Sequence, residues 1–222
     1  DAILVVSAHW HGEPLKVSAT LNPDTYHDFS GFPEALYQLK YPAPGSPALA
    51  NRIAQLLIRV GISCTIDAHR GFDHGAWTPL ILAYPTAKIP VVQLSVQYRQ
   101  SPQLHWQIGQ ALEMLRHEQI LIIGSGSATH NLAAMRPDYQ ALPPAWVWKF
   151  DDWLANAIEH QNWSALMQYR QIAPYGQKNH PTSEHLLPLF VAIGAVGQAA
   201  QTKQLYRGYT YGVLSMAAYA FH

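Results

Sequence analysis

Apolar residues along the chain fall into short runs and into longer stretches with a helical period. The short runs are rich in Val, Ile and Leu, as expected of buried strands, and occupy residues 2–7, 15–20, 64–68, 89–96, 120–123 and 213–218. The longer stretches predict amphipathic helices at residues 46–60, 104–116 and 147–159. Because predicted strands alternate with predicted helices, we expect an α/β fold: a single domain with a mixed central sheet flanked by helices.

The clearest of these helices lies at residues 46–60. Its apolar side chains recur on one stripe, and Gly61 follows as a C-terminal stop; the stripe consists of Leu49, Ile53, Leu56, Leu57 and Val60. Prolines interrupt residues 41–47 and 136–144, which predicts loops there.

Composition and charge narrow the classes of function. With 222 residues, 49% of them hydrophobic and 13% charged, the chain can bury one substantial core. The formal net charge is +0, so the chain lacks the basic surface that nucleic-acid binding requires. Its apolar runs are too short or too interrupted to span a bilayer, and no leader peptide is evident. We expect a cytoplasmic monomer or small homo-oligomer with neither nucleic acid nor membrane as a partner.

Histidine is the candidate metal ligand. The chain has 12 histidines against 14 lysines and arginines, whereas its one cysteine, Cys64, cannot form a thiolate cluster and reads as a buried apolar residue. Neutral imidazole is a common ligand for zinc and also suits iron.

Three histidines occupy positions where ligand sites form in α/β sheets, beyond the carboxyl ends of strands. His9 and His130 each follow a predicted strand. His185 precedes an apolar segment, and we expect Thr182 or Ser183 to cap a helix that begins there. Taken singly, each histidine is more often a hydrogen-bonded core or rim residue than a ligand, so the grouping carries the hypothesis.

Two further histidines are weaker candidates. His74 lies in Gly-Phe-Asp-His-Gly (residues 71–75), which also suits an ordinary turn. His27 lies among aromatic residues beside a carboxylate, which suits either a substrate wall or a polar loop. Trp10, next to His9, is the other candidate for contact with an aromatic substrate. The chain has no P-loop, dinucleotide fingerprint, zinc-protease helix or nucleophile elbow.

Seven sequence blocks, in order along the whole chain, resemble the DOPA 4,5-dioxygenase branch of the class III extradiol ring-cleavage dioxygenases. They are Val-Val-Ser-Ala-His-Trp (5–10), His-Asp-Phe-Ser-Gly-Phe-Pro (27–33), Tyr-Pro-Ala-Pro-Gly-Ser-Pro (41–47), Gly-Phe-Asp-His-Gly-Ala-Trp (71–77), Pro-Val-Val-Gln-Leu-Ser (90–95), Gly-Ser-Gly-Ser-Ala-Thr-His-Asn (124–131) and Pro-Thr-Ser-Glu-His (181–185).

The resemblance implies a non-haem Fe(II) site that opens a catechol such as L-DOPA with O2, with the active site at the strand ends. In family terms His9 and His185 match metal ligands, and His130 matches a histidine that contacts the metal or acts as a base. His74 matches a second catalytic histidine. We expect His130 to have a pKa near neutrality for the base role. The family also has a ligand histidine in a His-Gly-x-Pro segment upstream of the first block, so residues 1–222 are expected to form a catalytic domain without that segment and its strand.

Two other functions remain open from the residues. A zinc-dependent hydrolase or amidase could use the same histidines to activate a bound water, and Zn(II) can occupy such a site in purified protein. A non-enzymatic binding protein could retain the fold without the chemistry.

Overall fold

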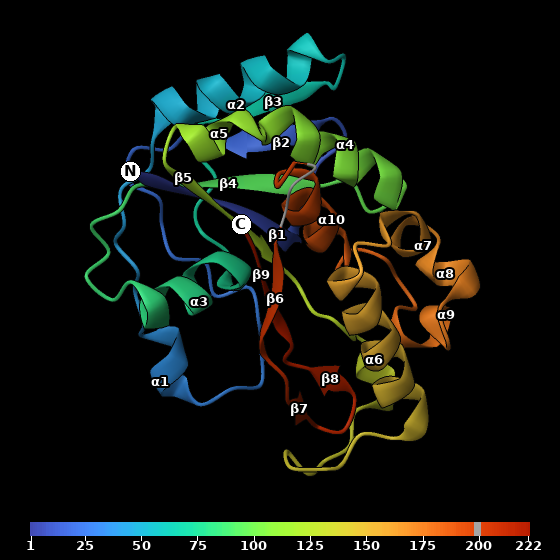
Figure 1. Cartoon of the computed structure of the whole chain (residues 1–222). Coiled ribbons are helices and arrows are strands. Elements are labelled where there is room, and N and C mark those ends of the chain that lie inside the picture. The colour runs from blue at the N-terminus through green and yellow to red at the C-terminus, as the bar shows by residue number, and fades with distance from the viewer. Residues whose placement is uncertain (198–200) are drawn as a thin grey trace.

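A five-stranded sheet forms the centre of the molecule in the computed structural model, which describes residues 1–197 and 201–222 (Figure 1). Its strands follow the order β3-β2-β4-β1-β5. β1 runs parallel to β4 and β5, and β2 runs parallel to β3 but antiparallel to β4. The strands are β1 (Ala2–His11), β2 (Leu15–Ser18), β3 (Cys64–Asp67), β4 (Val91–Val96) and β5 (Ile120–Ser125). The predicted α/β fold with a mixed sheet is therefore confirmed.

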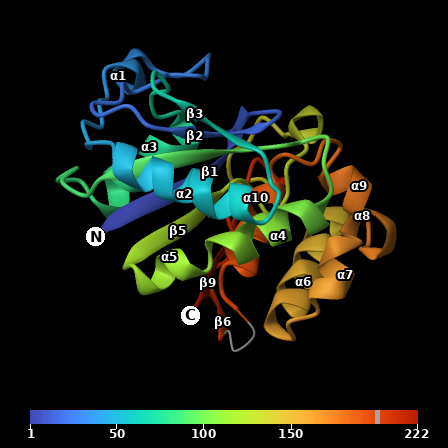
Figure 2. The same cartoon turned by 90° about the horizontal axis from the view of Figure 1, so that it is seen from above.

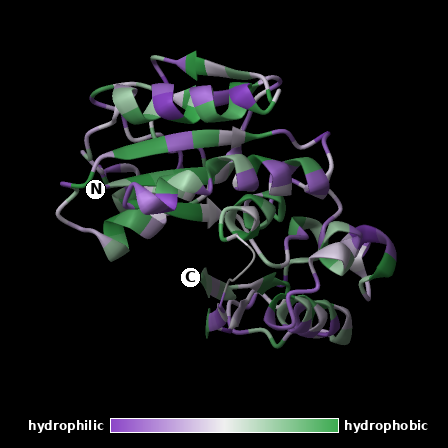
Figure 3. Ribbon diagram, turned by 45° about the horizontal axis from the view of Figure 1, so that its top comes forward, coloured by the Kyte–Doolittle hydropathy of each residue, from purple (hydrophilic) through white to green (hydrophobic). Residues whose placement is uncertain are grey.

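Side chains alternate across β1 and build a core on each face of the sheet. Leu4 and Val6 face the larger core, which includes α2 (Pro47–Arg59), α4 (Pro102–Leu112) and α10 (Leu187–Gly194). Ile3 and Val5 face a smaller core built with α3 (His74–Ala83). Figures 1 and 2 show α2 and α4 on one side of the sheet and α3 on the other. Figure 3 shows long hydrophobic stretches along the central strands, as expected of a sheet covered on both faces.

The remaining elements gather beside the carboxyl end of the sheet or at its edges. Two small antiparallel sheets pair β6 with β9 and β7 with β8. Asp151, a buried carboxylate in α6 (Ala145–Glu159), connects this helix to β7 and β8. It accepts hydrogen bonds from Tyr209 and Ser215, each at 2.7 Å, and from Arg207 at 3.0 Å. These elements are α1 (Glu34–Tyr37), α5 (Met114–His117), η1 (Leu132–Ala134), α6 (Ala145–Glu159), α7 (Trp163–Met167), α8 (Tyr169–Ile172), α9 (Gly176–Asn179), β6 (Thr202–Tyr206), β7 (Tyr209–Thr210), β8 (Leu214–Ser215) and β9 (Ala218–Phe221).

Local signals predicted α2 well, although Val60, the last residue of the predicted stripe, follows the helix and is exposed. Ser46 is its N-cap, and the Ser46 hydroxyl accepts a hydrogen bond from the Leu49 N–H at 3.2 Å. Gly61 follows the helix with a φ of +79°, a conformation that glycine adopts without strain. The loops predicted at residues 41–47 and 136–144 are also irregular in the structure, except that Pro47 is already the first residue of α2.

Four sequence predictions need correction. The first strand continues to His11, so His9 lies inside β1 and not beyond its end. The helix predicted at residues 104–116 is interrupted at Glu113, between α4 and α5. The strand predicted at residues 213–218 is instead β8 and the start of β9, both outside the central sheet. Lastly, no side chain caps α10, which begins at Leu187.

The cap was wrong because its candidate hydroxyl groups have other partners. Thr182 donates to the Glu184 carboxylate at 2.8 Å, and Ser183 donates to the Tyr98 carbonyl at 2.8 Å. Among the described residues, no helix has the length and apolar character needed to cross a bilayer.

Candidate active site

His9 lies near the carboxyl end of β1. The register between β1 and β4 is irregular between Val6 and His11, so this part of β1 departs from the regular ladder. The His9 N–H donates to the Ser7 hydroxyl at 3.2 Å. The alternation of β1 directs His9 toward the same side as Ser7, the side that α3 covers.

His74 is the first residue of α3, and its ring lies against that of His9. The two ring centroids are 3.9 Å apart. Asp28 Oδ1 accepts hydrogen bonds from both the backbone N–H and the Nδ1 of His74, each at 2.9 Å. His74 is therefore not part of an ordinary turn: it begins a helix and has a carboxylate partner.

His130 and His185 approach from the other end of the cluster. The His130 N–H donates to the Asn179 carbonyl at 3.0 Å, and the Ser127 N–H donates to the His185 carbonyl at 2.8 Å. Their rings stack nearly parallel, with centroids 3.4 Å apart and an interplanar angle of 9°. The His185 ring also meets the His9 ring edge-on, at 5.0 Å and 79°. Four imidazoles from separate segments thus form one continuous cluster in the order His74, His9, His185, His130.

Two glycines permit this close approach. A Cβ atom at Gly126 would lie 2.1 Å from the His185 carbonyl oxygen, and one at Gly75 would lie 2.6 Å from the Ser7 hydroxyl and 3.0 Å from the His9 ring. Neither position accommodates a larger residue unless the backbone or the buried side chains move.

A buried polar network centred on Asp73 lies next to His9 and His74. Asp73, which precedes His74 and is fully buried, accepts hydrogen bonds from the Ser7 hydroxyl at 2.7 Å and the Gln93 amide at 2.7 Å. It also forms an ion pair with Arg70 at 2.8 Å. This network connects the end of β1, the start of α3 and the middle of β4, so it sets where the first two imidazoles meet.

Burial keeps His9 and His130 neutral. It lowers the pKa of His9 to about 4, helped by the neighbouring His74 and His185 rings. Burial likewise lowers the pKa of His130 to about 4, with His185 contributing. The expectation of a His130 pKa near neutrality is therefore wrong for the protein without a bound ion. A neutral imidazole is the form that binds a metal and the form that accepts a proton.

Carboxylates hydrogen-bond two of the four rings. The Glu184 carboxylate contacts the His185 Nδ1 at 3.0 Å, and this bond lowers the Glu184 pKa to about 2. Burial opposes ionisation of Asp28, yet its hydrogen bonds from His74 lower the Asp28 pKa to about 2. Both side chains are ionised near neutral pH. Metal-binding histidines commonly have such a carboxylate partner on the second ring nitrogen.

The described residues contain two groups whose ligand atoms lie within 4.8 Å of one another and could hold a metal ion. One consists of His9, Asp28 and His74, and the other of His130, Glu184 and His185. The donors are imidazoles and carboxylates, which suit divalent first-row metals. The set of His9, His185 and His130 predicted from the sequence does not appear as one such group, although all three belong to the cluster.

The two predicted substrate contacts lie differently. His27 is part of an aromatic cluster with Trp77 and Phe29, at 5.6 and 5.9 Å, and its Nε2 hydrogen-bonds the Leu39 carbonyl at 2.9 Å. Phe29, which sequence reasoning missed, meets the His74 ring edge-on at 5.6 Å. Trp10 is buried, and the Arg70 guanidinium lies 5.0 Å from its ring centroid.

Sequence reasoning also missed His180. It is fully buried, and its Nε2 donates to the Ala128 carbonyl at 2.9 Å, so it supports the loop that carries His130. The only sequence signal was its position directly before the block at residues 181–185, because the hydrogen-bond partner of a histidine cannot be inferred from spacing.

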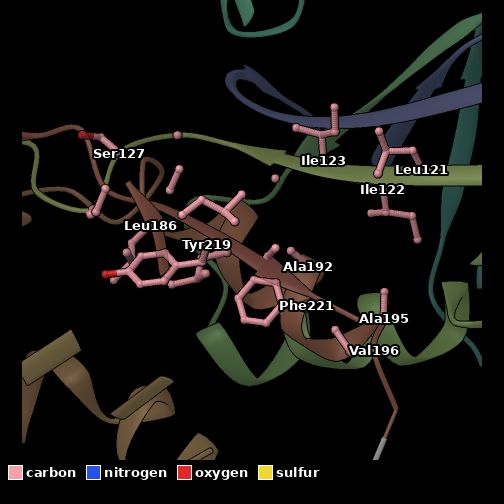
Figure 4. Close-up of a pocket in the computed structure, with 18 of the residues that line it drawn as sticks. Leu121, Ile122, Ile123, Ser127, Leu186, Ala192, Ala195, Val196, Tyr219 and Phe221 are labelled. Atoms are coloured by element: carbon pink, nitrogen blue, oxygen red, sulfur yellow. The ribbon is translucent and has the colours of Figure 1, made fainter. Parts of the chain in front are cut away.

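A largely apolar cavity of about 630 Å³ is lined in part by His185, but neither His9 nor His74 lines it. Figure 4 shows Leu121, Ile122 and Ile123 of β5 on one wall and Tyr219 and Phe221 of β9 near the opposite one. Its lining offers little acid–base chemistry, so the histidine cluster defines the candidate site.

The fold and the cluster define a class: an α/β protein in which imidazoles and carboxylates that could hold a metal ion gather near the carboxyl end of a mixed sheet. Residues 1–222 match the family described as the catalytic LigB subunit of aromatic ring-opening dioxygenase. The chain belongs to this family, and it is an enzyme of the extradiol dioxygenase type. The alternative of a non-enzymatic binding protein is therefore set aside.

Several relatives have a described activity. The chain is 45% identical over 221 residues to a 4,5-DOPA dioxygenase extradiol from Beta vulgaris, covering 99% of this chain and 82% of the relative. It is 40% identical over 200 residues to the Escherichia coli (strain K12) protein of that description, covering 88% and 72%. The crystal structure of an uncharacterized Escherichia coli K12 protein matches with a TM-score of 0.83 at 35% identity, covering 97% of this chain and 84% of the other.

Proposed function

We propose that this chain opens the ring of a catechol such as L-DOPA with O2, using Fe(II), and releases a muconic semialdehyde of the 4,5-seco-DOPA type. The observation that carries the proposal is the convergence of four imidazoles in a member of an aromatic ring-opening dioxygenase family. The relatives described as 4,5-DOPA dioxygenases support the choice of substrate.

His9 and His185 would hold the metal. Their rings meet edge-on, and Glu184 occupies the His185 Nδ1, which leaves the His185 Nε2 as the donor. When bound, Fe(II) would supply coordination for the diol oxygens and O2 and a path for electrons from the ring to the oxidant. The predicted ligand histidine in an upstream His-Gly-x-Pro segment lies outside residues 1–222 and stays a prediction.

His130 would act as the base and not as a ligand in the same state. A ring nitrogen binds a metal through a lone pair in the ring plane, and the His130 and His185 planes are nearly parallel at a centroid distance of 3.4 Å. Two stacked rings cannot both direct lone pairs at one ion between them. A neutral His130 nitrogen can instead accept a proton from a catechol hydroxyl and return it later.

His74 would contact a substrate hydroxyl through Nε2, because Asp28 occupies Nδ1. Phe29 and His27 would form the aromatic side of the substrate site, since Phe29 packs against His74 and His27 packs against Phe29. Trp10 as a substrate contact stays a prediction, and its described partner is Arg70.

Anaerobic loading with Fe(II), followed by L-DOPA and air, tests the proposal. The expected result is a yellow semialdehyde with one O2 consumed per molecule of product. Absence of O2 uptake by the iron-loaded full chain with a panel of catechols would refute it. Hydrolysis of an ester or amide by the zinc-loaded protein, without O2, would support the hydrolase alternative instead. Zinc content alone would decide nothing, because such sites commonly bind zinc more tightly than Fe(II).

A further inference from the structure

Asp28 makes both of its described hydrogen bonds with a single residue of the cluster. Its Oδ1 accepts from the backbone N–H of His74 and from the His74 Nδ1, each at 2.9 Å. Both side chains are partly exposed, 32% for Asp28 and 29% for His74. A carboxylate accepts hydrogen bonds and cannot donate one, so the contact requires the proton of a neutral His74 to be on Nδ1.

The segment that carries Asp28 is held in place by contacts with the strand-to-helix connection that carries His74. The Tyr26 N–H donates to the Phe72 carbonyl at 2.7 Å, and the Trp77 indole N–H donates to the Tyr26 carbonyl at 2.8 Å. On the other side of Asp28, the Phe29 ring packs edge-on against the His74 ring. Asp28 therefore meets His74 in a defined orientation and not from a free loop.

We propose that Asp28 is a positioning residue for ring cleavage: it keeps His74 in the Nδ1–H tautomer and directs the unprotonated Nε2 toward the reacting diol. The inference rests on the proposed function for its catalytic meaning. The Asp28–His74 contact has a counterpart in the Glu184–His185 contact at 3.0 Å, so the two carboxylates act alike on the two sides of His9. Neither carboxylate was predicted from the sequence to act on the reaction.

If Asp28 served only to support the start of α3, a different result would be expected. The His74 backbone N–H, in the first turn of α3, has no acceptor within the helix, and Asp28 accepts its hydrogen bond instead. In Asp28→Asn, the amide oxygen in the place of Oδ1 can still accept both hydrogen bonds, but the negative charge that favours a proton on Nδ1 is lost, so the preference of His74 for the Nδ1–H tautomer weakens. Replacement by Asn therefore separates support of the helix from control of the tautomer.

Side-chain nitrogen NMR of protein labelled with ¹⁵N-histidine tests the tautomer without any metal or substrate. The His74 signals are identified by their loss in His74→Gln. In the wild-type protein we expect a protonated Nδ1 and an unprotonated Nε2 for His74, and in Asp28→Asn we expect a shift of the proton toward Nε2. A wild-type His74 that is protonated on Nε2 would overturn the proposal, even if no variant could be purified.

Kinetics of the iron-loaded full chain test the consequence. For Asp28→Asn we expect kcat to fall roughly 10- to 100-fold, the range typical of residues that orient a site histidine, while iron content and thermal stability stay close to wild type. Glu34→Gln is the matched control: this exposed carboxylate on α1 contacts Gln38 at 3.1 Å, and its loss should leave kcat unchanged.

The outcomes separate the two proposals. Two results with Asp28→Asn would overturn the positioning role. One is a kcat equal to that of the wild type. The other is loss of iron, because it would indicate that Asp28 is a metal ligand. If the wild-type protein is inactive but its His74 tautomer still depends on Asp28, the proposed function is refuted. The effect of Asp28 on His74 would then still be established.

Discussion

Replacing Asp73 by alanine should be among the most destabilising single substitutions in this protein. Asp73 is fully buried, and its carboxylate accepts from the Ser7 hydroxyl, the Gln93 amide and the Arg70 guanidinium. Alanine would leave these donors without their acceptor, and Arg70 would keep its charge in a site that is only 19% exposed.

The magnitude follows from the burial of the ion pair. Removing one partner of a buried pair typically costs about 3–5 kcal/mol, because the remaining charge is uncompensated. Since water reaches Arg70 in part, we expect the lower end, about 3 kcal/mol. For a chain of this length, about 2–4 °C of melting temperature is lost per kcal/mol, so the melting temperature should fall by about 6–12 °C.

Urea unfolding followed by tryptophan fluorescence measures the change, provided that the slope against urea is unaltered. Glu118→Gln provides the control, because it breaks the Arg52–Glu118 pair, in which both side chains are about one-third exposed, 34% and 37%. An exposed pair contributes less than about 1 kcal/mol. If Asp73→Ala destabilises the protein no more than Glu118→Gln, the buried network does not support the site as argued.

Three further predictions concern the site and the core. His130→Ala should abolish most turnover, measured by O2 uptake, while iron content stays near wild type; retained turnover would remove His130 as the base. Gly126→Ala should lower both iron content and turnover, because the new Cβ would lie 2.1 Å from the His185 carbonyl oxygen and force the backbone to move. The control for this variant is Gly61→Ala: no atom lies within 4 Å of the new Cβ, so only stability should fall, because of the φ of +79°. Phe190→Ala, at a fully buried position of α10, should cost about 3–5 kcal/mol in urea unfolding, and a cost below about 1 kcal/mol would mean that the core closes over the gap.

Periodicity and local chemistry were sufficient for the elements whose side chains meet the core regularly. The stripe along α2, its Ser46 cap and the Gly61 stop all depend on neighbours within a few residues, so the sequence predicted that helix closely. The histidine blocks also identified His9, His74, His130 and His185, the four rings that the fold brings together.

Tertiary contacts decided where these elements end and which polar groups pair. β1 continues through His9 to His11, where His11 pairs with Val96 of β4, whatever the polarity of its side chains. Asp28 and His74 are 46 positions apart, and Ser7 and Asp73 are 66 apart. The hydrophobic pattern of a chain specifies which residues are buried, but it carries no information about which distant donor meets which acceptor. The sequence by itself therefore determined the fold class and the four histidines that cluster, whereas only the folded chain determined which carboxylates hydrogen-bond two of them.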